Sequence, residues 1–405
     1  MHQVRRGALD GRASDRGMTR MPAVVAQRSI LINAWGSMGD VAPFLALGQG
    51  LARSGAQVTV LTTANFGPTV ISAGLAFESI GSQEACERAL ADPALWDPQR
   101  ADALIDALFE LTISQLRTSL LQAKRSGPVL FIAGTRGIRA REVLADLGLP
   151  ILGVYLTPEI FRADHSSCKL GLFPPWFAQA GESDPEAMLM TGFVPVDGQP
   201  GNPDTLARLQ DFLRQGPAPV TFTFGTAMKQ GESLFAAARD ACRQLNCRAI
   251  FLSRFEEQIP QDLDEDQFLH IDYMPLRILL PLTSALVFHG GVGTCAQALI
   301  AGCPQVVVPM AHDQMANADR VVALGVGAAV LGDDRDGPKL AIIMRKAMND
   351  AAILDVCKRY SSVAREADGL RTAIARIESC FAEVANHVVV QGGVVPACGA
   401  VSPIK

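Results

Sequence analysis

The sequence lacks an excess of charge of either sign, and this excludes one class of partner. Lysine and arginine together number 36, aspartate and glutamate 41, and the formal net charge is -5, with no long run of one sign. A surface that binds nucleic acid needs a strongly basic face. We therefore expect no nucleic acid among the partners.

Paired cysteine motifs and long apolar runs are also missing. The nine cysteines include no CxxC pair, and an odd number cannot all pair within the chain, so reduced thiols and a cytoplasmic location are expected. No stretch reaches the roughly 18 apolar residues that a membrane span requires. Any membrane contact would then be peripheral, at the inner membrane face.

Length and periodicity predict two α/β domains. The 405 residues exceed what one hydrophobic core usually organises. Short apolar runs alternate with helical stretches, as in βαβ units around a buried parallel sheet. The first series has expected strands at 29–34, 57–62, 129–133 and 151–155, with helices near 42–53, 101–124 and 138–147. The second series has expected strands at 220–224, 249–252, 268–271, 285–288 and 305–308.

Composition sets the expected domain boundaries. Residues 1–26 carry five arginines and no apolar signal-peptide core, so they are predicted to be a disordered extension. An N-terminal domain is expected at 27–195, a linker rich in proline and glycine at 196–204, and a C-terminal domain at 205–381. A tail follows at 382–405. Two such sheets bind ligands in the cleft between the carboxyl ends of their strands.

A glycine-rich turn in the second half predicts a diphosphate site. Residues 285–301 are ALVFHGGVGTCAQALIA, which is an apolar strand, a turn and a helix that opens near Thr294. Glycines let the backbone approach a phosphate, and the helix N-terminus adds partial positive charge. The P-loop pattern and the GxGxxG spacing are both absent. His289 is expected to donate to the diphosphate, with a purely structural histidine as the alternative.

A second glycine turn, near the start, carries the carboxylate of Asp40. Residues 30–44 are ILINAWGSMGDVAPF, a strand, a turn and a helix expected to open around Pro43, where proline is tolerated in the first turn. Asp40 is predicted to project from the loop at the carboxyl end of the first strand into the cleft. The alternative is a helix-capping carboxylate.

On these residues the sequence resembles the GT-B glycosyltransferases that include the bacterial antibiotic and sterol enzymes and the rhamnolipid rhamnosyltransferase catalytic chain. The resemblance runs from about residue 28 to residue 381. The family pattern HxGxGTxx[EQ], a following Gly-x-Pro, and a later acidic residue with Gln and Asn are matched by His289, Gly291, Gly293, Thr294, Gln297, Gly302, Pro304, Asp313, Gln314 and Asn317. The family's GSxGDVxP pattern is matched at 36–43.

The resemblance implies two Rossmann-like domains facing across a cleft, the N-terminal one binding the acceptor and the C-terminal one binding the nucleotide sugar. It also implies an inverting transferase that needs no metal or other cofactor. It makes Asp40 the catalytic base and Asp313 with Gln314 the groups that hold the sugar. Thr226 would hold a phosphate across the cleft, although a plain Gly-Thr turn is the alternative. The implied donor site comprises Gly39, Thr226, Tyr273, Met274, Pro275, His289, Gly291, Gly293, Thr294, Gln297, Asp313 and Gln314, with the nucleobase against residues 273–275.

Gln297 indicates which nucleotide the donor sugar carries. Within the resembling family, enzymes that use UDP-sugars usually carry a glutamate here, which accepts from both ribose hydroxyls. A neutral amide suits the single hydroxyl of a deoxyribose better, so dTDP-L-rhamnose is the expected donor. An exposed helix residue without a ligand is the alternative.

The acceptor is expected to be apolar. The resemblance places its pocket in the first domain, where the candidate residues are Phe109, Phe161, Leu172, Phe173 and Trp176. A hydroxyalkanoyl-hydroxyalkanoate suits such a pocket, as do a sterol and a polyketide. Only about a dozen residues separate Pro158 from Leu170, fewer than in the family. A pocket shortened in this way could be completed by a companion protein, for example one that synthesises the acceptor.

Two other functions share these features. A sugar-nucleotide epimerase can have the same two-domain cleft, and a non-catalytic partner would bind a nucleotide sugar without turnover. The GSMGDV and MAHDQ stretches favour the transferase over the epimerase. Asp40 argues against the non-catalytic partner.

Overall fold

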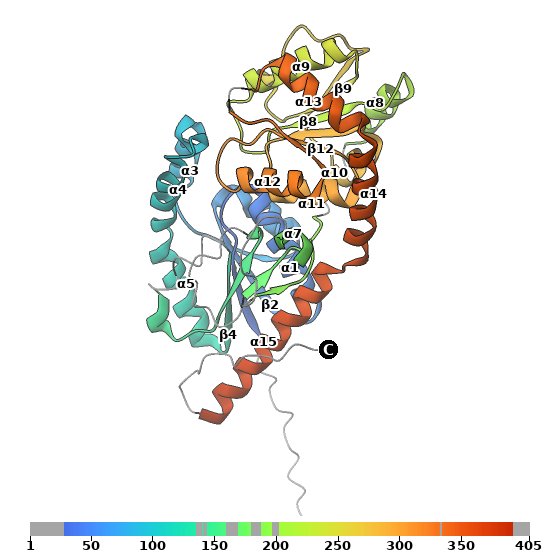
Figure 1. The fold of residues 1–405 in the computed structure, drawn as a ribbon. Helices are drawn as coiled ribbons and strands as arrows, with labels where there is room; N and C mark the ends of the chain where they lie inside the picture. The colour runs from blue at the N-terminus through green and yellow to red at the C-terminus, as the bar shows by residue number, and fades with distance from the viewer. Residues whose placement is uncertain are drawn as a thin grey trace, which may run out of the picture.

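A computed structural model describes residues 28–134, 140, 144–158, 169–179, 188–196, 202–332 and 334–391, without the side chains of 383–391. The expected disordered extension, the candidate Phe161 and half of the expected helix at 138–147 lie outside these ranges. Figure 1 shows the described chain as two α/β units, one above the other.

The first half of the chain forms a seven-stranded sheet in the order β3-β2-β1-β4-β5-β6-β7, with every pair parallel. The four expected strands are confirmed, and three short ones were not predicted. The strands are β1 (Ser29–Asn33), β2 (Gln57–Thr62), β3 (Ala76–Ser79), β4 (Val129–Gly134), β5 (Ile151–Tyr155), β6 (Lys169–Gly171) and β7 (Leu189–Met190).

The second half forms a six-stranded parallel sheet in the order β10-β9-β8-β11-β12-β13. All five expected strands are confirmed. The strands are β8 (Val220–Thr223), β9 (Ala249–Leu252), β10 (Phe268–Ile271), β11 (Ala285–Phe288), β12 (Gln305–Val307) and β13 (Gly327–Ala329). Two doubly wound parallel sheets are the predicted fold class.

Helices cover both sheets. Those of the first half are α1 (Met38–Arg53), α2 (Gly67–Ser72), α3 (Gln83–Ala91), α4 (Ala101–Glu110), α5 (Ile113–Ser126) and α7 (Pro175–Gln179). Those of the second half are α8 (Pro203–Arg214), α9 (Glu232–Leu245), α10 (Leu276–Leu279), α11 (Val292–Ala301), α12 (Gln314–Leu324), α13 (Gly337–Asn349), α14 (Ala351–Glu366) and α15 (Gly369–Gln391). Short 3-10 turns are η1 (Ala64–Phe66), η2 (Pro93–Trp96), η4 (Ala145–Leu147), η6 (Glu256–Gln258) and η7 (Leu280–Leu282).

Two expected helices differ from the structure. The single helix predicted at 101–124 is divided into α4 and α5, and the buried Thr112 at the break donates its hydroxyl to the carbonyl of Phe109 at 2.7 Å. That local bond competes with helical continuation. Helix α1 begins at Met38, one turn before the expected start, so Pro43 lies inside the helix instead of in its first turn.

Helix α15 returns from the second sheet to the first. Its residues Ala373, Ile377, Cys380 and Phe381 belong to the buried cluster that contains β1 and α1. The approach to α1 is close, because a Cβ on Gly50 would lie 2.1 Å from Cδ1 of Ile374. The chain therefore crosses between the domains twice, and the C-terminal helix completes the core of the N-terminal domain (Figure 1).

A shared apolar cluster joins the two domains. It contains Phe173 and Phe177 from the first half together with Phe288 and Leu299 from the second. Trp176 of α7 stacks on Tyr360 of α14, with ring centroids 4.8 Å apart. The buried cluster and this half-buried aromatic pair hold the two domains together.

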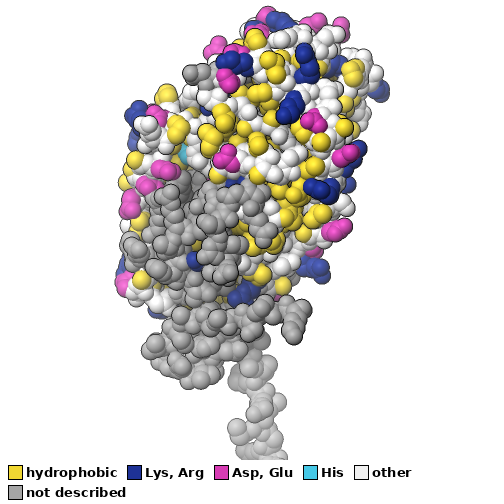
Figure 2. Space-filling model, in the orientation of Figure 1, with side chains coloured by type: hydrophobic (Ala, Val, Ile, Leu, Met, Phe, Trp, Pro, Cys, Tyr) yellow, Lys and Arg dark blue, Asp and Glu magenta, His cyan; other side chains and the backbone are white. Residues whose placement is uncertain are grey.

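The surface carries mixed charge. On the described part of the face in Figure 2, basic and acidic side chains are interspersed, without a field of one sign. Within the described ranges, no helix has both the length and the apolar character required to cross a bilayer.

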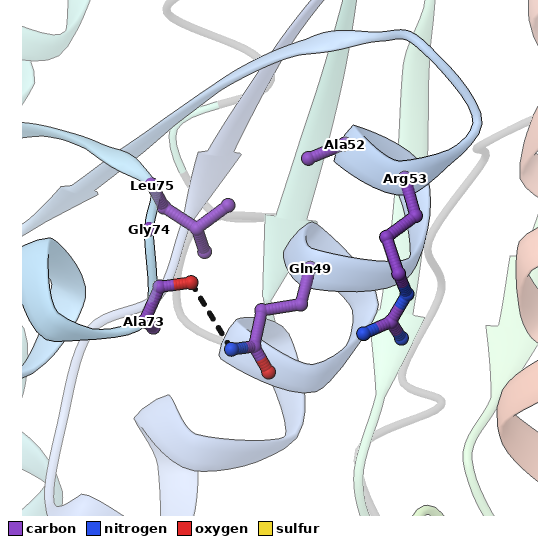
Figure 3. A pocket seen from close by; sticks show the side chains of 6 residues that line it. All are labelled: Gln49, Ala52, Arg53, Ala73, Gly74 and Leu75. Carbon is purple, nitrogen blue, oxygen red and sulfur yellow. Dashed lines mark hydrogen bonds between the residues drawn. The ribbon is translucent and has the colours of Figure 1, made fainter.

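A hollow of about 300 Å³ on the N-terminal domain lies away from the cleft. It is lined by Gln49, Ala52, Arg53, Ala73, Gly74 and Leu75, and Gln49 closes one side by donating to the carbonyl of Ala73 (Figure 3). Arg53 is the last residue of α1, about 20 Å along the helix axis from Asp40. The hollow is therefore separate from the candidate site.

Candidate functional site

The two glycine turns occupy equivalent places in the two sheets. Strand β1 lies between β2 and β4, and β8 lies between β9 and β11, so the strand order reverses beside each. Such switch points open a crevice at the carboxyl ends of the strands. Asp40 follows β1, whereas Thr226 and His289 follow β8 and β11.

His289 is enclosed by glycine. A Cβ on Gly291 would lie 2.7 Å from its Nε2, and one on Gly225 would lie 3.0 Å away, so a side chain at either position would displace the imidazole. Burial lowers the pKa of His289 to about 4, with the backbone of Thr223 opposing the shift and nearby His312 adding to it. The ring is neutral at pH 7. Its Nδ1 is shielded from solvent and has no hydrogen-bond partner among the described residues.

Helix α11 begins two residues before the expected start, at Val292, with Gly291 as its N-cap. Gly291 has no side chain that could cap the first turn. Gly293 is exposed, and no atom lies within 4 Å of the position that a Cβ would take there. The N-terminus of the helix is therefore open to an anion, and the half-buried Thr294 stands in this first turn.

Asp313 is tied to the glycine turn through Asn317. The amide of Asn317, fully buried on α12, donates both to Oδ2 of Asp313 at 2.9 Å and to the carbonyl of Gly290 at 2.8 Å. One side chain thus fixes the predicted sugar-binding carboxylate relative to the predicted diphosphate turn. The sequence pattern included Asn317 but gave it no role.

Gln314 is largely occupied within the protein. It is 3% exposed, and its Oε1 accepts from the backbone N–H groups of Met310 and Ala311 at 2.8 and 3.1 Å. The acceptor half of this amide therefore orders the loop before α12. Only Nε2 remains for the predicted contact with a sugar hydroxyl.

Gln297 lies at the domain boundary. Its Nε2 donates to the backbone carbonyl of Val196, in the segment that leaves the N-terminal domain, at 3.3 Å. This bond orients the amide and leaves Oε1 as the acceptor. A glutamate at this position could not make it, since a carboxylate has no proton to donate.

The remaining predicted donor residues differ in exposure. Thr226 is exposed in the loop after β8. Tyr273 is 47% exposed, whereas Met274 is 1% exposed in a core cluster and Pro275 is buried as the N-cap of α10. Of the three residues predicted to face a nucleobase, only Tyr273 presents a surface in this conformation.

Asp40 lies in the first turn of α1, whereas the sequence predicted that it would project from the preceding loop. Its Oδ2 accepts from the backbone N–H and the hydroxyl of Ser37 at 2.7 and 2.8 Å. Gly36, with φ of +139°, leaves the room this requires, because a Cβ there would lie 2.5 Å from Oδ2. The carboxylate is exposed, and Oδ1 is left free of these capping bonds. Gly39, beside it, is exposed as well.

The two glycine turns face the same region. Met38, which opens α1, and Val292, which opens α11, both pack against the core cluster of the N-terminal domain. Figure 1 shows α1 directly beneath α11 and α12. The described residues contain no group of three or more His, Cys, Asp or Glu side chains placed to hold a metal ion.

The predicted acceptor residues lie mainly in cores and at the domain interface. Phe109 is 1% exposed and packs edge-on against Trp35, while Leu172 and Phe173 are 4% and 0% exposed. Trp176 is half-buried against Tyr360. Packing therefore accounts for their apolar character, and their positions do not add support to an acceptor role.

Two contacts between the domains were not predicted from the sequence. Arg320 is 1% exposed on α12 and places its guanidinium 5.6 Å from the ring of Phe177 in the N-terminal domain. Trp96 of η2 packs edge-on against His312, with ring centroids 5.7 Å apart. Both contacts join segments far apart in the chain, so local sequence pattern carries no signal for them.

Comparison with known proteins agrees with this geometry. Residues 30–139 match the glycosyltransferase family 28 N-terminal domain, and residues 256–372 match the erythromycin biosynthesis protein CIII-like C-terminal domain. The chain is a GT-B glycosyltransferase of the antibiotic and sterol group.

The glycosyltransferase resembles characterised enzymes along most of its length. It is 26% identical to the O-mycaminosyltylonolide 6-deoxyallosyltransferase of Streptomyces fradiae, over 86% of this chain and 96% of the relative. It is 25% identical to the dTDP-epi-vancosaminyltransferase of Amycolatopsis orientalis, over 80% and 89%. The solved glycotransferase of kitacinnamycin has a TM-score of 0.70 at 17% identity, covering 88% of this chain and 99% of that one, which shows the fold.

Proposed function

We propose that the glycosyltransferase moves a sugar from a dTDP-sugar to a hydroxyl group of an apolar natural product such as a polyketide. One observation carries the proposal: neutral His289 and the uncapped start of α11 stand together at the end of β11. Backbone N–H groups, the helix dipole and a neutral imidazole N–H all stabilise the charge of a departing diphosphate.

Asp40 supplies the base in this proposal. Its Oδ2 is held by Ser37, so Oδ1 takes the proton as the acceptor oxygen attacks the anomeric carbon. The bond from that carbon to the diphosphate oxygen breaks, and dTDP leaves with its electron pair. Attack opposite the leaving group inverts the anomeric centre. Base catalysis of this kind contributes roughly 10²- to 10⁴-fold.

The donor assignment depends on Gln297, whose neutral amide supplies one acceptor oxygen to the ribose. The name of the Amycolatopsis relative specifies a dTDP-sugar donor. The name of the Streptomyces relative specifies transfer of a 6-deoxy sugar. Asp313 and the Nε2 of Gln314 contact sugar hydroxyls in this arrangement.

L-rhamnose with a hydroxyalkanoyl-hydroxyalkanoate acceptor is the second candidate. Gln297 and the MAHDQ stretch at 310–314 favour it. The name of the Streptomyces relative specifies O-mycaminosyltylonolide as acceptor, and this supports the first candidate. Rhamnolipid synthesis is therefore the narrower proposal.

Calorimetry against dTDP and UDP, followed by transfer assays, tests the function. Wild type should bind dTDP more tightly than UDP and should release dTDP only when an acceptor is present, whereas an epimerase would need none. Asp40→Asn should lower kcat by at least about 10²-fold and leave the Kd for dTDP unchanged. Ser37→Ala, which keeps the carboxylate, should lower kcat far less. Equal activity of Asp40→Asn and wild type would remove the base assignment.

A further inference from the structure

A segment of the N-terminal domain reaches across to the C-terminal domain. Helix α3, the turn η2 and helix α4 form an arm that stands beside α12 in Figure 1. Trp96 at its tip packs against the core of the C-terminal domain. The backbone carbonyl of Ala91 also accepts a hydrogen bond from Nε2 of Gln230 at 3.5 Å. Two contacts therefore connect the arm to loops that follow strands of the second sheet.

The indole nitrogen of Trp96 is shielded from solvent yet unsatisfied. Its Nε1 has no hydrogen-bond partner among the described residues. An indole N–H can only donate, and leaving a buried donor unpaired is unfavourable, so such a group calls for an explanation. One explanation is that the indole N–H donates to an oxygen of a bound ligand, which the protein alone does not supply.

The surroundings of Trp96 indicate which ligand. Its ring lies against His312, a residue with the uncommon φ of +62° directly before Asp313. His312 in turn is close enough to His289 to affect its pKa. The indole therefore stands beside the loop that presents Asp313, on the sugar side of the proposed diphosphate position.

We infer that the indole N–H of Trp96 donates a hydrogen bond to a hydroxyl of the donor sugar, so that the arm contributes a specificity-determining residue from the opposite domain. The inference rests on the proposed function. It differs from simple edge-on packing against His312, because packing needs the ring but not its N–H group.

Trp96→Phe separates the two, since phenylalanine keeps a ring and removes the donor. Calorimetry with dTDP and dTDP-glucose, repeated with UDP and UDP-glucose, should show a Kd for the sugar nucleotide about three- to tenfold higher in the variant, as expected for one lost hydrogen bond. The Kd for the free nucleoside diphosphate should be unchanged, which also shows that the variant is folded.

Gln230→Ala is the matched control, because it removes the other contact of the arm and leaves the indole in place. It should not change the ratio of the two affinities. Three results would each overturn the inference and leave the proposed function standing. In Trp96→Phe, the ratio of the two Kd values could be unchanged, or the free nucleoside diphosphate could lose as much affinity as the sugar nucleotide. In Gln230→Ala, the Kd for the sugar nucleotide could rise as much as in Trp96→Phe. If wild type bound none of the four nucleotides, the proposed function and the inference would both be wrong.

Discussion

His289 shows how a residue can be made neutral by its surroundings. The glycines on either side allow backbone to close around the imidazole, and the resulting burial disfavours its charged form. The pattern HGGVG allowed a prediction that His289 serves a phosphate. It could not supply the protonation state, which depends on the neighbouring strand and on a loop from elsewhere in the chain.

The lowered pKa of His289 predicts a pH-dependent stability. Between its usual value of about 6.5 and its folded value of about 4, the unfolded chain binds more protons than the folded one. The free energy of unfolding should therefore fall as the pH is lowered through this window. Because the residue keeps some solvent exposure, we expect a loss on the order of 2 kcal/mol.

Urea unfolding at pH 7.5 and pH 4.5, for wild type and His289→Gln, measures this term. The variant should lose less stability than wild type over the same interval, because carboxylates contribute equally to both. Identical pH dependence in the two proteins would contradict the assignment of a buried neutral imidazole.

Gln297 provides the second prediction at this scale. Gln297→Glu replaces the amide that donates to Val196 with a carboxylate that cannot donate. We expect about 1 kcal/mol less stability from the lost bond and a severalfold shift of nucleotide preference from dTDP toward UDP.

Calorimetric Kd values for both nucleotides and chemical unfolding measure the two effects of Gln297→Glu. Gln297→Ala is the control, since it loses the bond to Val196 without adding a charge, and it should lower stability without favouring UDP. If Gln297→Glu left the ratio of the Kd values for dTDP and UDP unchanged, Gln297 would not determine the choice of donor.

Among the elements, the buried strands were the most predictable. Runs such as 249–252 and 285–288 are wholly apolar and buried on both faces, as parallel sheets require. The short strands β3, β6 and β7 lack such runs: β3 and β7 are the edges of the sheet and β6 lies next to β7, and much of β3 is exposed. Their existence depends on neighbours already in place, and the sequence alone does not show this.

Helix α7 demonstrates how similar composition can serve two purposes. Its aromatic residues were predicted to line an acceptor pocket, and the structure uses them to join the domains. Trp176 stacks on Tyr360 and contacts the ring of Phe193 edge-on, at centroid distances of 4.8 and 5.8 Å. Apolar character predicts burial but does not specify against what.

Trp176→Ala should therefore lower the free energy of unfolding rather than acceptor affinity. Since the indole is half-buried, we expect about 2–4 kcal/mol, measured by denaturant unfolding. A double-mutant cycle with Tyr360→Ala should give a coupling of about 0.5–1.5 kcal/mol. A raised KM for acceptor with unchanged stability would instead restore the pocket interpretation.

For the whole molecule, the two-domain organisation followed from length and repeated βα pattern, but the return of α15 did not. The predicted C-terminal domain ended at residue 381, although the helix that contains this residue packs on the N-terminal domain. Nothing in an amphipathic helix specifies which of two sheets it covers. Contacts between distant segments decide the matter.

The contact between α1 and α15 predicts that one substitution, Gly50→Ala, changes stability in opposite directions in two backgrounds. Alanine at Gly50 should destabilise wild type by about 1–3 kcal/mol, because its Cβ would meet Ile374. In an Ile374→Ala background the same change should be neutral or stabilising by up to about 1 kcal/mol, since alanine favours a helix interior.

Thermal and urea unfolding of Gly50→Ala, Ile374→Ala and the double variant provide the cycle. Destabilisation by Gly50→Ala of the same size in both backgrounds would show that α15 does not rest on α1 as described.

The two crossings between the domains meet at one point. Gly369 lies so close to Gly192 that a Cβ on it would come within 2.6 Å of the carbonyl oxygen of Gly192. In Figure 1 this crossing lies on the right, and the arm that carries Trp96 lies on the left. The domains are therefore joined on two opposite sides, by this crossing and by the contact of Trp96 with His312. Any hinge motion at the crossing that moved the domains apart would have to separate the indole from the imidazole.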